Sequence, residues 1–185
     1  MGKYKILIVL LLSILGLSCE QSMETNNSSA ISYQTSDPSR LFFKNMKSIN
    51  YDLKEAGNSK IEFYQLKKWE SNTPRPLLIP VIANNWLEDK AYLLLKKNVY
   101  WRKNLPDASI IFKSEHEEKS FKLERKNPEE QTQMALEIYD ALTKQEGSYH
   151  IHLQDSTQIN LFKDNMDLYY FTTTVKDYLR LIDRI

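Results

Sequence analysis

The chain of 185 residues has little cysteine and little glycine, and both shortages narrow what it can be. Its only cysteine is Cys19, so no disulfide can form within the chain and the fold must be stabilised by packing. Of its four glycines, only Gly57 and Gly147 lie beyond the N-terminal segment. Phosphate-cradling loops, dinucleotide-binding turns and the G-x-S-x-G turn of many hydrolases need clustered glycines. These three kinds of site are therefore excluded in their usual form.

The chain also lacks an excess of either charge. Its 25 lysines and arginines balance 24 aspartates and glutamates, which gives a formal net charge of +1. Domains that bind nucleic acid or anionic membranes through their overall charge carry a strong basic excess. The near-neutral balance therefore argues against a nucleic acid partner.

What the chain does have is a distinctive N-terminus. Lys3 and Lys5 form a short basic region, and the residues from Ile6 to Leu17 are almost wholly apolar. This run has the length of the hydrophobic region of a secretory signal, and it is shorter than the roughly 20 residues that span a bilayer as a helix. The pattern predicts export from the cytoplasm.

The only cysteine follows this apolar run. Leu15-Gly16-Leu17-Ser18-Cys19 resembles the lipobox of bacterial lipoproteins, although Gly16 stands where leucine is commonest in that motif. The resemblance implies that residues 1–18 are a signal peptide and that Cys19 becomes the first residue of the mature chain, carrying acyl groups such as palmitate. It also implies a lipid anchor in the cell envelope, in the outer rather than the inner membrane of a Gram-negative cell. The alternatives are an uncleaved anchor and a secreted protein with a free thiol.

Beyond Cys19 the sequence predicts a tether and then one folded domain. Residues 20–38 are rich in Ser, Thr, Asn and Gln and contain few core-forming side chains, which is typical of disordered segments. The remaining residues are enough for one hydrophobic core, and they show no internal repeat and no second boundary. We therefore expect residues 19–38 to form a lipidated, disordered tether and residues 39–185 to form a single domain.

Short apolar runs separated by turn residues predict a mostly antiparallel sheet in this domain. The alternating residues 48–54 and the run 60–69 are expected to form a hairpin around Gly57. The apolar run 77–83 predicts a strand buried on both faces, although Pro80 favours an edge, a bulge or a break. The run 91–97 could be a strand or a helix, and the turn residues around it favour a strand. Two further hairpins are expected, one from strands over 109–112 and 121–123 and one from strands over 149–153 and 158–162.

Two longer stretches, over about 128–146 and 165–185, predict helices, because each carries an apolar stripe at helical spacing. Asn127 can cap the first helix, Pro128 fits its first position, and Gly147 is expected to end it. The predicted fold class is therefore α+β, with a mostly antiparallel, meander-like sheet packed by these two helices of the C-terminal half.

Two histidines form the best candidate for a metal site. His150 and His152 lie two residues apart on a predicted strand, so both side chains point to the same side. A catalytic zinc needs a third protein ligand, and Glu146 or Asp155 could approach. The alternative is that the histidines occupy the solvent-facing side of a strand whose apolar residues face the core.

Neighbouring carboxylates could also act as general acid and base where their surroundings separate their pKa values. Such groups occur at Glu88 and Asp89 and over residues 115–118, both in predicted turns. Acids in turns are usually solvated, so the sequence identifies no catalytic residue.

A mixed aromatic and basic segment is the best candidate for a binding surface. Residues 96–103 include Tyr100, Trp101 and Arg102, which are residue types that dominate protein interfaces and can also contact sugars or anionic headgroups. Trp86, which precedes two acids, is a second candidate. The alternative for the segment is a strand end whose aromatic residues enter the core while its lysines stay in solvent.

These patterns favour a membrane-anchored envelope lipoprotein that acts as a non-enzymatic binding or interaction module. Its partner would be a protein or an envelope polymer, and an immunity-type role against an incoming toxin is one form of this hypothesis. No cofactor is expected. The alternative is a membrane-tethered hydrolase that uses a metal at His150 and His152 or a pair of carboxylates.

Overall fold

The computed structural model describes residues 31–185, except for residues 56, 58–59, 68–72, 115–117, 122, 124–125, 146 and 153–156. The segment Ser32–Ile185 forms one unit. The predicted signal peptide, Cys19 and most of the predicted tether lie outside the described residues. Within the described ranges, none of the helices combines the length and the apolar character that crossing a membrane requires.

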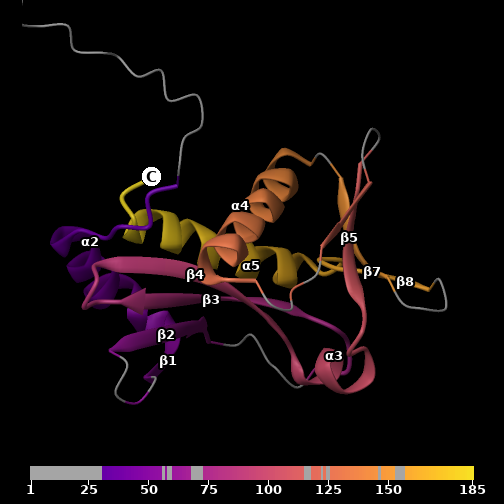
Figure 1. The fold of residues 1–185 in the computed structure, drawn as a ribbon, viewed down its shortest axis with the longest axis horizontal. Helices are drawn as coiled ribbons and strands as arrows, with labels where there is room; N and C mark the ends of the chain where they lie inside the picture. The colour runs from indigo at the N-terminus through magenta and orange to yellow at the C-terminus, as the bar shows by residue number, and fades with distance from the viewer. Residues whose placement is uncertain are drawn as a thin grey trace, which may run out of the picture. The chain divides into compact units, whose positions relative to one another are not determined.

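An antiparallel sheet of four strands follows the chain order β1-β2-β3-β4 (Figure 1). Its strands are β1 Tyr51–Glu55, β2 Ile61–Leu66, β3 Leu78–Asn85 and β4 Lys90–Lys97. Every residue of β3 except the last is buried, which confirms the strand expected to be covered on both faces. Pairing between β2 and β3 ends at Tyr64 and Ile82, so Pro80 lies beyond the part of β3 that is bonded to β2. Its missing N–H therefore does not interrupt the hydrogen bonds between these two strands.

A second antiparallel sheet has the order β6-β5-β7-β8. Its strands are β5 Ser109–Lys113, β6 Glu118–Phe121, β7 Ser148–His152 and β8 Gln158–Asn160. The pairs β5–β6 and β7–β8 confirm the two predicted hairpins, but β6 begins at Glu118, which was expected in the turn, and not at Phe121. The α+β fold class is thus confirmed, but the strands form two sheets, because a short helix, α3 Val99–Asn104, turns the chain away after β4.

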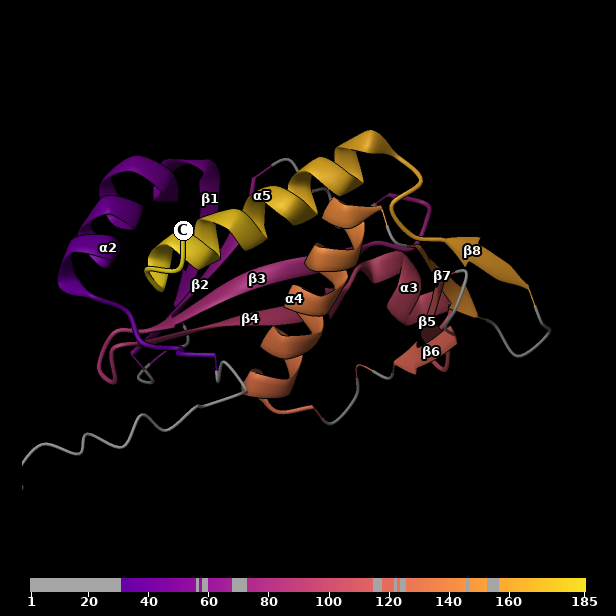
Figure 2. The same cartoon turned by 90° about the horizontal axis from the view of Figure 1, so that it is seen from above.

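Two long helices pack against the first sheet (Figure 2). Helix α4, Pro128–Lys144, begins at a capping box between Asn127 and Glu130, and helix α5, Asn165–Leu181, begins after the cap Asp164. Helix α5 contacts β3 and β4, while α4 contacts β4 and α5. Both predicted helices are confirmed, with their ends a few residues earlier than expected.

The end of α4 corrects one prediction. The left-handed residue after the helix is Gln145, with φ of 57°, and not Gly147. Gly147 serves a different purpose, because a Cβ atom there would lie 2.4 Å from the carbonyl oxygen of Lys113 and 2.6 Å from the ring of Phe112. The glycine therefore permits the close approach of the chain entering β7 to β5.

The N-terminal part of the folded unit was not expected from the sequence. Helix α2, Asp37–Phe42, begins at a capping box between Ser36 and Ser39 and continues into the π-helical turn η1, Phe43–Lys47, and the 3₁₀ turn η2, Ser48–Asn50. Ahead of it, the N–H of Thr35 donates to the carbonyl of Asp89 over 2.8 Å, and the N–H of Ala91 donates to Tyr33 over 2.9 Å.

These residues correct the predicted boundaries. The disordered tether was expected to reach Pro38, but the chain is already bonded to the start of β4 from Tyr33 onward. The strand expected over 48–54 begins only at Tyr51, because the residues before it belong to η1 and η2. The apolar alternation there was misleading, since Ile49 and Leu53 are 73% and 49% exposed.

Candidate binding groove

A groove of about 690 Å³ lies between the N-terminal helix and the first sheet. Residues of α2 and η1 form one wall, the β1–β2 hairpin and the end of β3 form the other, and the turn after β3 and the end of α5 complete it. The residues that line it include Arg40, Leu41, Glu55, Glu62, Asn84 and Trp86.

Aromatic packing fixes the helical wall to the sheet. Phe43 is 4% exposed, and its ring centroid lies 5.6 Å from that of Tyr51 and 5.1 Å from that of Tyr64. The contact between Phe43 and Tyr64 is edge-to-face, which is a favourable arrangement for two rings. These aromatic contacts pack the helical wall of the groove against the sheet.

A buried carboxylate on α5 reinforces this wall. Asp177 accepts a hydrogen bond from the hydroxyl of Tyr51 over 3.0 Å and pairs with the ammonium of Lys47 over 3.0 Å. Burial is the main reason why the pKa of the Tyr51 hydroxyl is raised, and the charge of Asp177 adds to it. At the end of the same helix, the hydroxyl of Ser39 donates to the carbonyl of Leu181 over 2.7 Å. Three contacts with one helix thus set the position of α2, η1 and β1.

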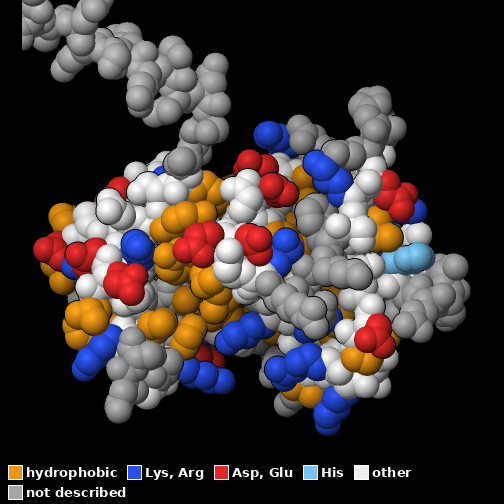
Figure 3. Space-filling model, viewed as in Figure 1, with side chains coloured by type: hydrophobic (Ala, Val, Ile, Leu, Met, Phe, Trp, Pro, Cys, Tyr) orange, Lys and Arg blue, Asp and Glu red, His pale blue; other side chains and the backbone are white. Residues whose placement is uncertain are grey.

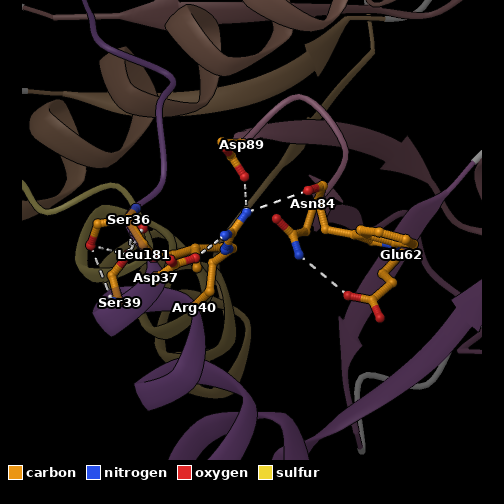
Figure 4. Close-up of polar contacts among 9 residues, drawn as sticks. Ser36, Asp37, Ser39, Arg40, Glu62, Asn84, Asp89 and Leu181 are labelled. Atoms are coloured by element: carbon orange, nitrogen blue, oxygen red, sulfur yellow. Dashed lines mark hydrogen bonds and ion pairs between the residues drawn. The ribbon is translucent and has the colours of Figure 1, made fainter.

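Arg40 is the charged residue at the centre of the polar contacts (Figure 4). Its guanidinium pairs with the carboxylates of Asp37 and Asp89 and donates to the carbonyl of Trp86 over 3.4 Å. The two carboxylates raise the pKa of Arg40 above its ordinary value. This arginine therefore ties α2 to the turn between β3 and β4, which carries Trp86.

The opposite side of the groove carries a carboxylate with two donors. The Oε2 atom of Glu62 accepts from the hydroxyl of Tyr64 over 2.8 Å and from Nδ2 of Asn84 over 3.3 Å. Burial first, and then the bond to Glu62, raise the pKa of the Tyr64 hydroxyl. The Oδ1 atom of Asn84 is buried and has no hydrogen-bond partner in the described part of the chain.

Apolar side chains remain exposed at the groove. Trp86 is 44% exposed and Leu41 is 61% exposed. The ammonium of Lys60 lies 5.5 Å from the centroid of the Trp86 ring, which is a cation–π distance. Trp86, predicted from the sequence as a binding candidate, therefore lies in a hollow and beside charged groups.

The other predicted binding residues lie elsewhere. Trp101 is completely buried, so its prediction as a binding residue is wrong; its ring belongs to the core. Tyr100 is half-buried and Arg102 is exposed, both on α3. The segment was expected either to bind or to form a strand end, and it is instead a helix that begins at the cap Asn98.

Basic side chains gather at this end of β4. Figure 3 shows Lys and Arg side chains over α3 and the strand ends beside it. Partial burial, followed by the charges of Lys54 and Arg102, lowers the pKa of Lys96 below 10.5. The ammonium of Lys96 lies 5.6 Å from the Phe63 ring. The region is a cluster of like charges on an open surface.

The two histidines lie on β7 as the alternation predicted. Tyr149 and Ile151 are buried, whereas His150 and His152 are half-buried. The hydroxyl of Ser148 lies 2.7 Å from Nε2 of His150. The possible third ligands Glu146 and Asp155 lie outside the described residues, and the described residues contain no group of three side chains placed to hold a metal.

The carboxylate pairs take part in surface contacts. Asp89 pairs with Arg40, and Glu88 lies 3.7 Å from the ammonium of Lys90. In the other predicted group, Glu118 lies 3.6 Å from Lys113, and residues 115–117 lie outside the described residues. These described acids therefore form ion pairs with lysines and an arginine at the surface.

Sequence reasoning missed most of the groove. The start of α2 had a recognisable signal, because Ser36, Asp37 and Pro38 are a cap, an acid and a proline in the order typical of a helix start. Glu62 and Asn84 had no such signal, since their contact depends on the register between β2 and β3, where they are directly opposed.

Comparisons of the chain with protein-family models, with curated proteins and with solved structures find no match.

Proposed function

We propose that the chain is a lipid-anchored envelope protein whose folded part binds a partner protein through the groove beside α2. The observation that carries the proposal is the exposed Trp86, held over a hollow of about 690 Å³. Tryptophan is strongly enriched among the side chains that dominate binding energy at protein interfaces. An exposed indole at a groove is therefore typical of an interaction site.

The surroundings of Trp86 support a protein as the partner. Arg40 pairs with Asp37 and Asp89 and bonds the carbonyl of Trp86. These contacts hold the backbone of the turn that carries the Trp86 indole before any partner binds. A preorganised site loses less entropy when a partner binds. Apolar Leu41 and the charged groups around it give the mixture of an apolar centre and a polar rim that protein interfaces have.

The lipobox resemblance around Cys19 supports the anchor. If it holds, a Cys19→Ala variant should lose acyl labelling in cells and leave the membrane fraction. Two or more acyl chains hold a protein stably on a membrane, so the change in fractionation should be nearly complete. Labelling that persists in the variant would contradict the assignment of Cys19.

The binding part has a separate test. The C-terminally tagged chain is crosslinked in cells, and captured proteins are identified by mass spectrometry in the parent chain, in Trp86→Ala and in Tyr169→Ala. Tyr169 is a suitable control, because it is an aromatic residue on α5 that is 58% exposed. We expect one reproducible partner that is lost in Trp86→Ala and kept in Tyr169→Ala. Equal capture by all three chains would refute the groove as the binding site.

A further inference from the structure

Two carboxylates oppose each other at the groove. Glu55 on β1 and Glu62 on β2 are directly paired in the strand register, and both line the groove. Opposed residues of an antiparallel pair share one face, with Cβ atoms roughly 5 Å apart, and like charges in that position destabilise the pair. The hairpin therefore keeps an electrostatically unfavourable arrangement at the groove.

No described cation neutralises this pair. Lys44 and Lys60 line the groove, yet in the described part of the chain neither forms an ion pair with Glu55 or Glu62. The third cation of the groove, Arg40, pairs with Asp37 and Asp89 instead. Within the described residues, the two carboxylates therefore have no ion-pair partner beside an open hollow.

The side-chain amide oxygen of Asn84 also lacks a partner at the groove within the described residues. Asn84 is 7% exposed, and its amide lies between Arg40 and Glu62, with the nitrogen toward Glu62 and the oxygen on the side of Arg40 (Figure 4). Its Oδ1 atom is buried and has no donor within the described residues. A buried acceptor without a donor is unfavourable, so a group that donates a hydrogen bond there is favoured. The missing chemistry is a donor and a positive charge.

The exposed apolar residues at the groove favour a cation that is carried on an alkyl chain. Trp86 and Leu41 are exposed there, and the ammonium of Lys60 already lies 5.5 Å from the indole ring. A cation on an alkyl stem can place its stem along such side chains and its head beside carboxylates. A bare metal ion makes no use of the apolar residues.

We propose that the groove binds the cationic side chain of a partner polypeptide, an arginine guanidinium or a lysine ammonium. Glu55 and Glu62 supply the charge, Asn84 supplies an acceptor, and Trp86 with Leu41 contacts the alkyl stem. The inference rests on the proposed function, because it names the part of the partner protein that the groove takes.

The test follows two reporter groups by NMR in the full chain, purified in detergent: the side-chain amide of Asn84 and the indole N–H of Trp86. The probes are Nα-acetyl-arginine methylamide, the matching lysine and glutamine compounds, and calcium chloride. We expect saturable shifts at both reporters with the arginine or lysine compound and much smaller shifts with the uncharged glutamine compound. Shifts of equal size with glutamine, or shifts with calcium alone, would overturn the proposal, as would an absence of shifts with every probe.

A matched pair of variants completes the test. Glu55 is exposed, so Glu55→Gln should fold normally while weakening the binding of the arginine compound by roughly tenfold, since a charge-assisted contact is lost. Glu137→Gln removes the same charge from an exposed position on α4 and should leave the affinity unchanged. Equal affinities in both variants would contradict the role of the carboxylate pair.

The two proposals can fail separately. Capture of a partner that depends on Trp86 but is unchanged in Glu55→Gln refutes the cationic group and leaves the groove as a binding site. Specific binding of the arginine compound without any Trp86-dependent partner supports the chemistry of the groove and counts against a protein partner in the cell.

Discussion

The two ends of β4 each carry a tryptophan, and the two side chains have opposite fates. Trp86 stands in the turn before the strand and is 44% exposed, whereas Trp101 stands in α3 after the strand and is fully buried. Charged residues follow both tryptophans in the chain, acids after Trp86 and basic residues after Trp101, and neither pattern reveals whether the ring is buried. The difference lies in the backbone that presents each ring.

At the end of β4 near the buried Trp101, Asn98 sets the path of the backbone. Its Oδ1 atom accepts from the N–H groups of Trp101 over 3.0 Å and Leu77 over 3.2 Å, and its Nδ2 atom donates to the carbonyl of Arg75 over 2.8 Å. Asn98 lies between β4 and α3, and its side chain caps α3 and also bonds the chain that leads into β3. The indole is thereby carried into the core, and Asn98 itself is only 1% exposed.

At the exposed end, surface contacts present the ring. The turn is held by Arg40 through Trp86 and Asp89, and Asp89 adopts a positive φ of 54°. These contacts position the backbone without covering the indole. One end of β4 is thus built to hold the fold, and the other end leaves an aromatic side chain available for binding.

Replacement of the two tryptophans should give the largest contrast. Trp101→Ala leaves a cavity in a packed core and should lower the free energy of unfolding by about 3–5 kcal/mol. Trp86→Ala removes a partly exposed ring and should cost less than about 1 kcal/mol. Urea denaturation of both variants measures the difference. Similar losses in the two variants would show that the two rings contribute equally to the stability of the fold.

The second prediction concerns the helical wall of the groove. Asp177→Ala removes the acceptor of the buried Tyr51 hydroxyl and the partner of Lys47, and we expect a loss of about 2–4 kcal/mol, because a buried ion pair is broken. Asp140→Ala, at an exposed position of α4, is the control and should change the stability by less than about 0.5 kcal/mol. Equal unfolding midpoints for these two variants would show that Asp177 does not hold the wall.

The third prediction concerns the middle of β4, between the two tryptophans. The N–H of Leu93 donates to the hydroxyl of Thr132 over 2.9 Å, so α4 supplies an acceptor that the edge of the sheet would otherwise lack. Thr132→Val leaves this buried N–H without an acceptor and should cost about 1–3 kcal/mol. Thr132→Ser keeps the hydroxyl and should lose less. Hydrogen exchange at the Leu93 amide should accelerate in the valine variant only.

The smallest expected effect concerns Lys96 at the buried end. Its pKa lies below 10.5 in the folded chain, mainly because of partial burial and also because of Lys54 and Arg102. The unfolded chain therefore binds more protons between the folded pKa and 10.5, so stability should rise with pH in that window. NMR titration of the Lys96 ammonium should show the lowered pKa, and Arg102→Gln should move it back upward. An unchanged titration in that variant would exclude Arg102 as a cause.

The secondary structure of the C-terminal half could be predicted because its signals are local. The cap at Asn127 with Pro128 identifies α4, and the alternation of Tyr149 and Ile151 with histidines identifies β7. The division into two sheets could not be predicted, because it depends on the pairing of β5 with β7, which are separated in sequence by α4.

The groove escaped prediction for a similar reason. Glu55, Glu62 and Asn84 belong to three different strands, and only their register brings them together. Trp86 could be identified as a candidate from its residue type alone. Its contact with Arg40 could not be predicted, because Arg40 lies in a helix that the polar composition of the N-terminal segment did not indicate. Residue type predicted Trp101 as a binding residue in the same way, and burial overturned it.

Site-specific photo-crosslinking can establish whether the exposed end of β4 binds a partner. A photoreactive phenylalanine derivative replaces Trp86 in one chain, Tyr100 on α3 in a second and Tyr169 on α5 in a third. Because Trp86 alone among these lines the groove, we predict a discrete crosslinked product from the first chain, lost when Glu55→Gln is added, and no such product from the other two. The same product from all three positions, or from Tyr100 alone, would contradict the account.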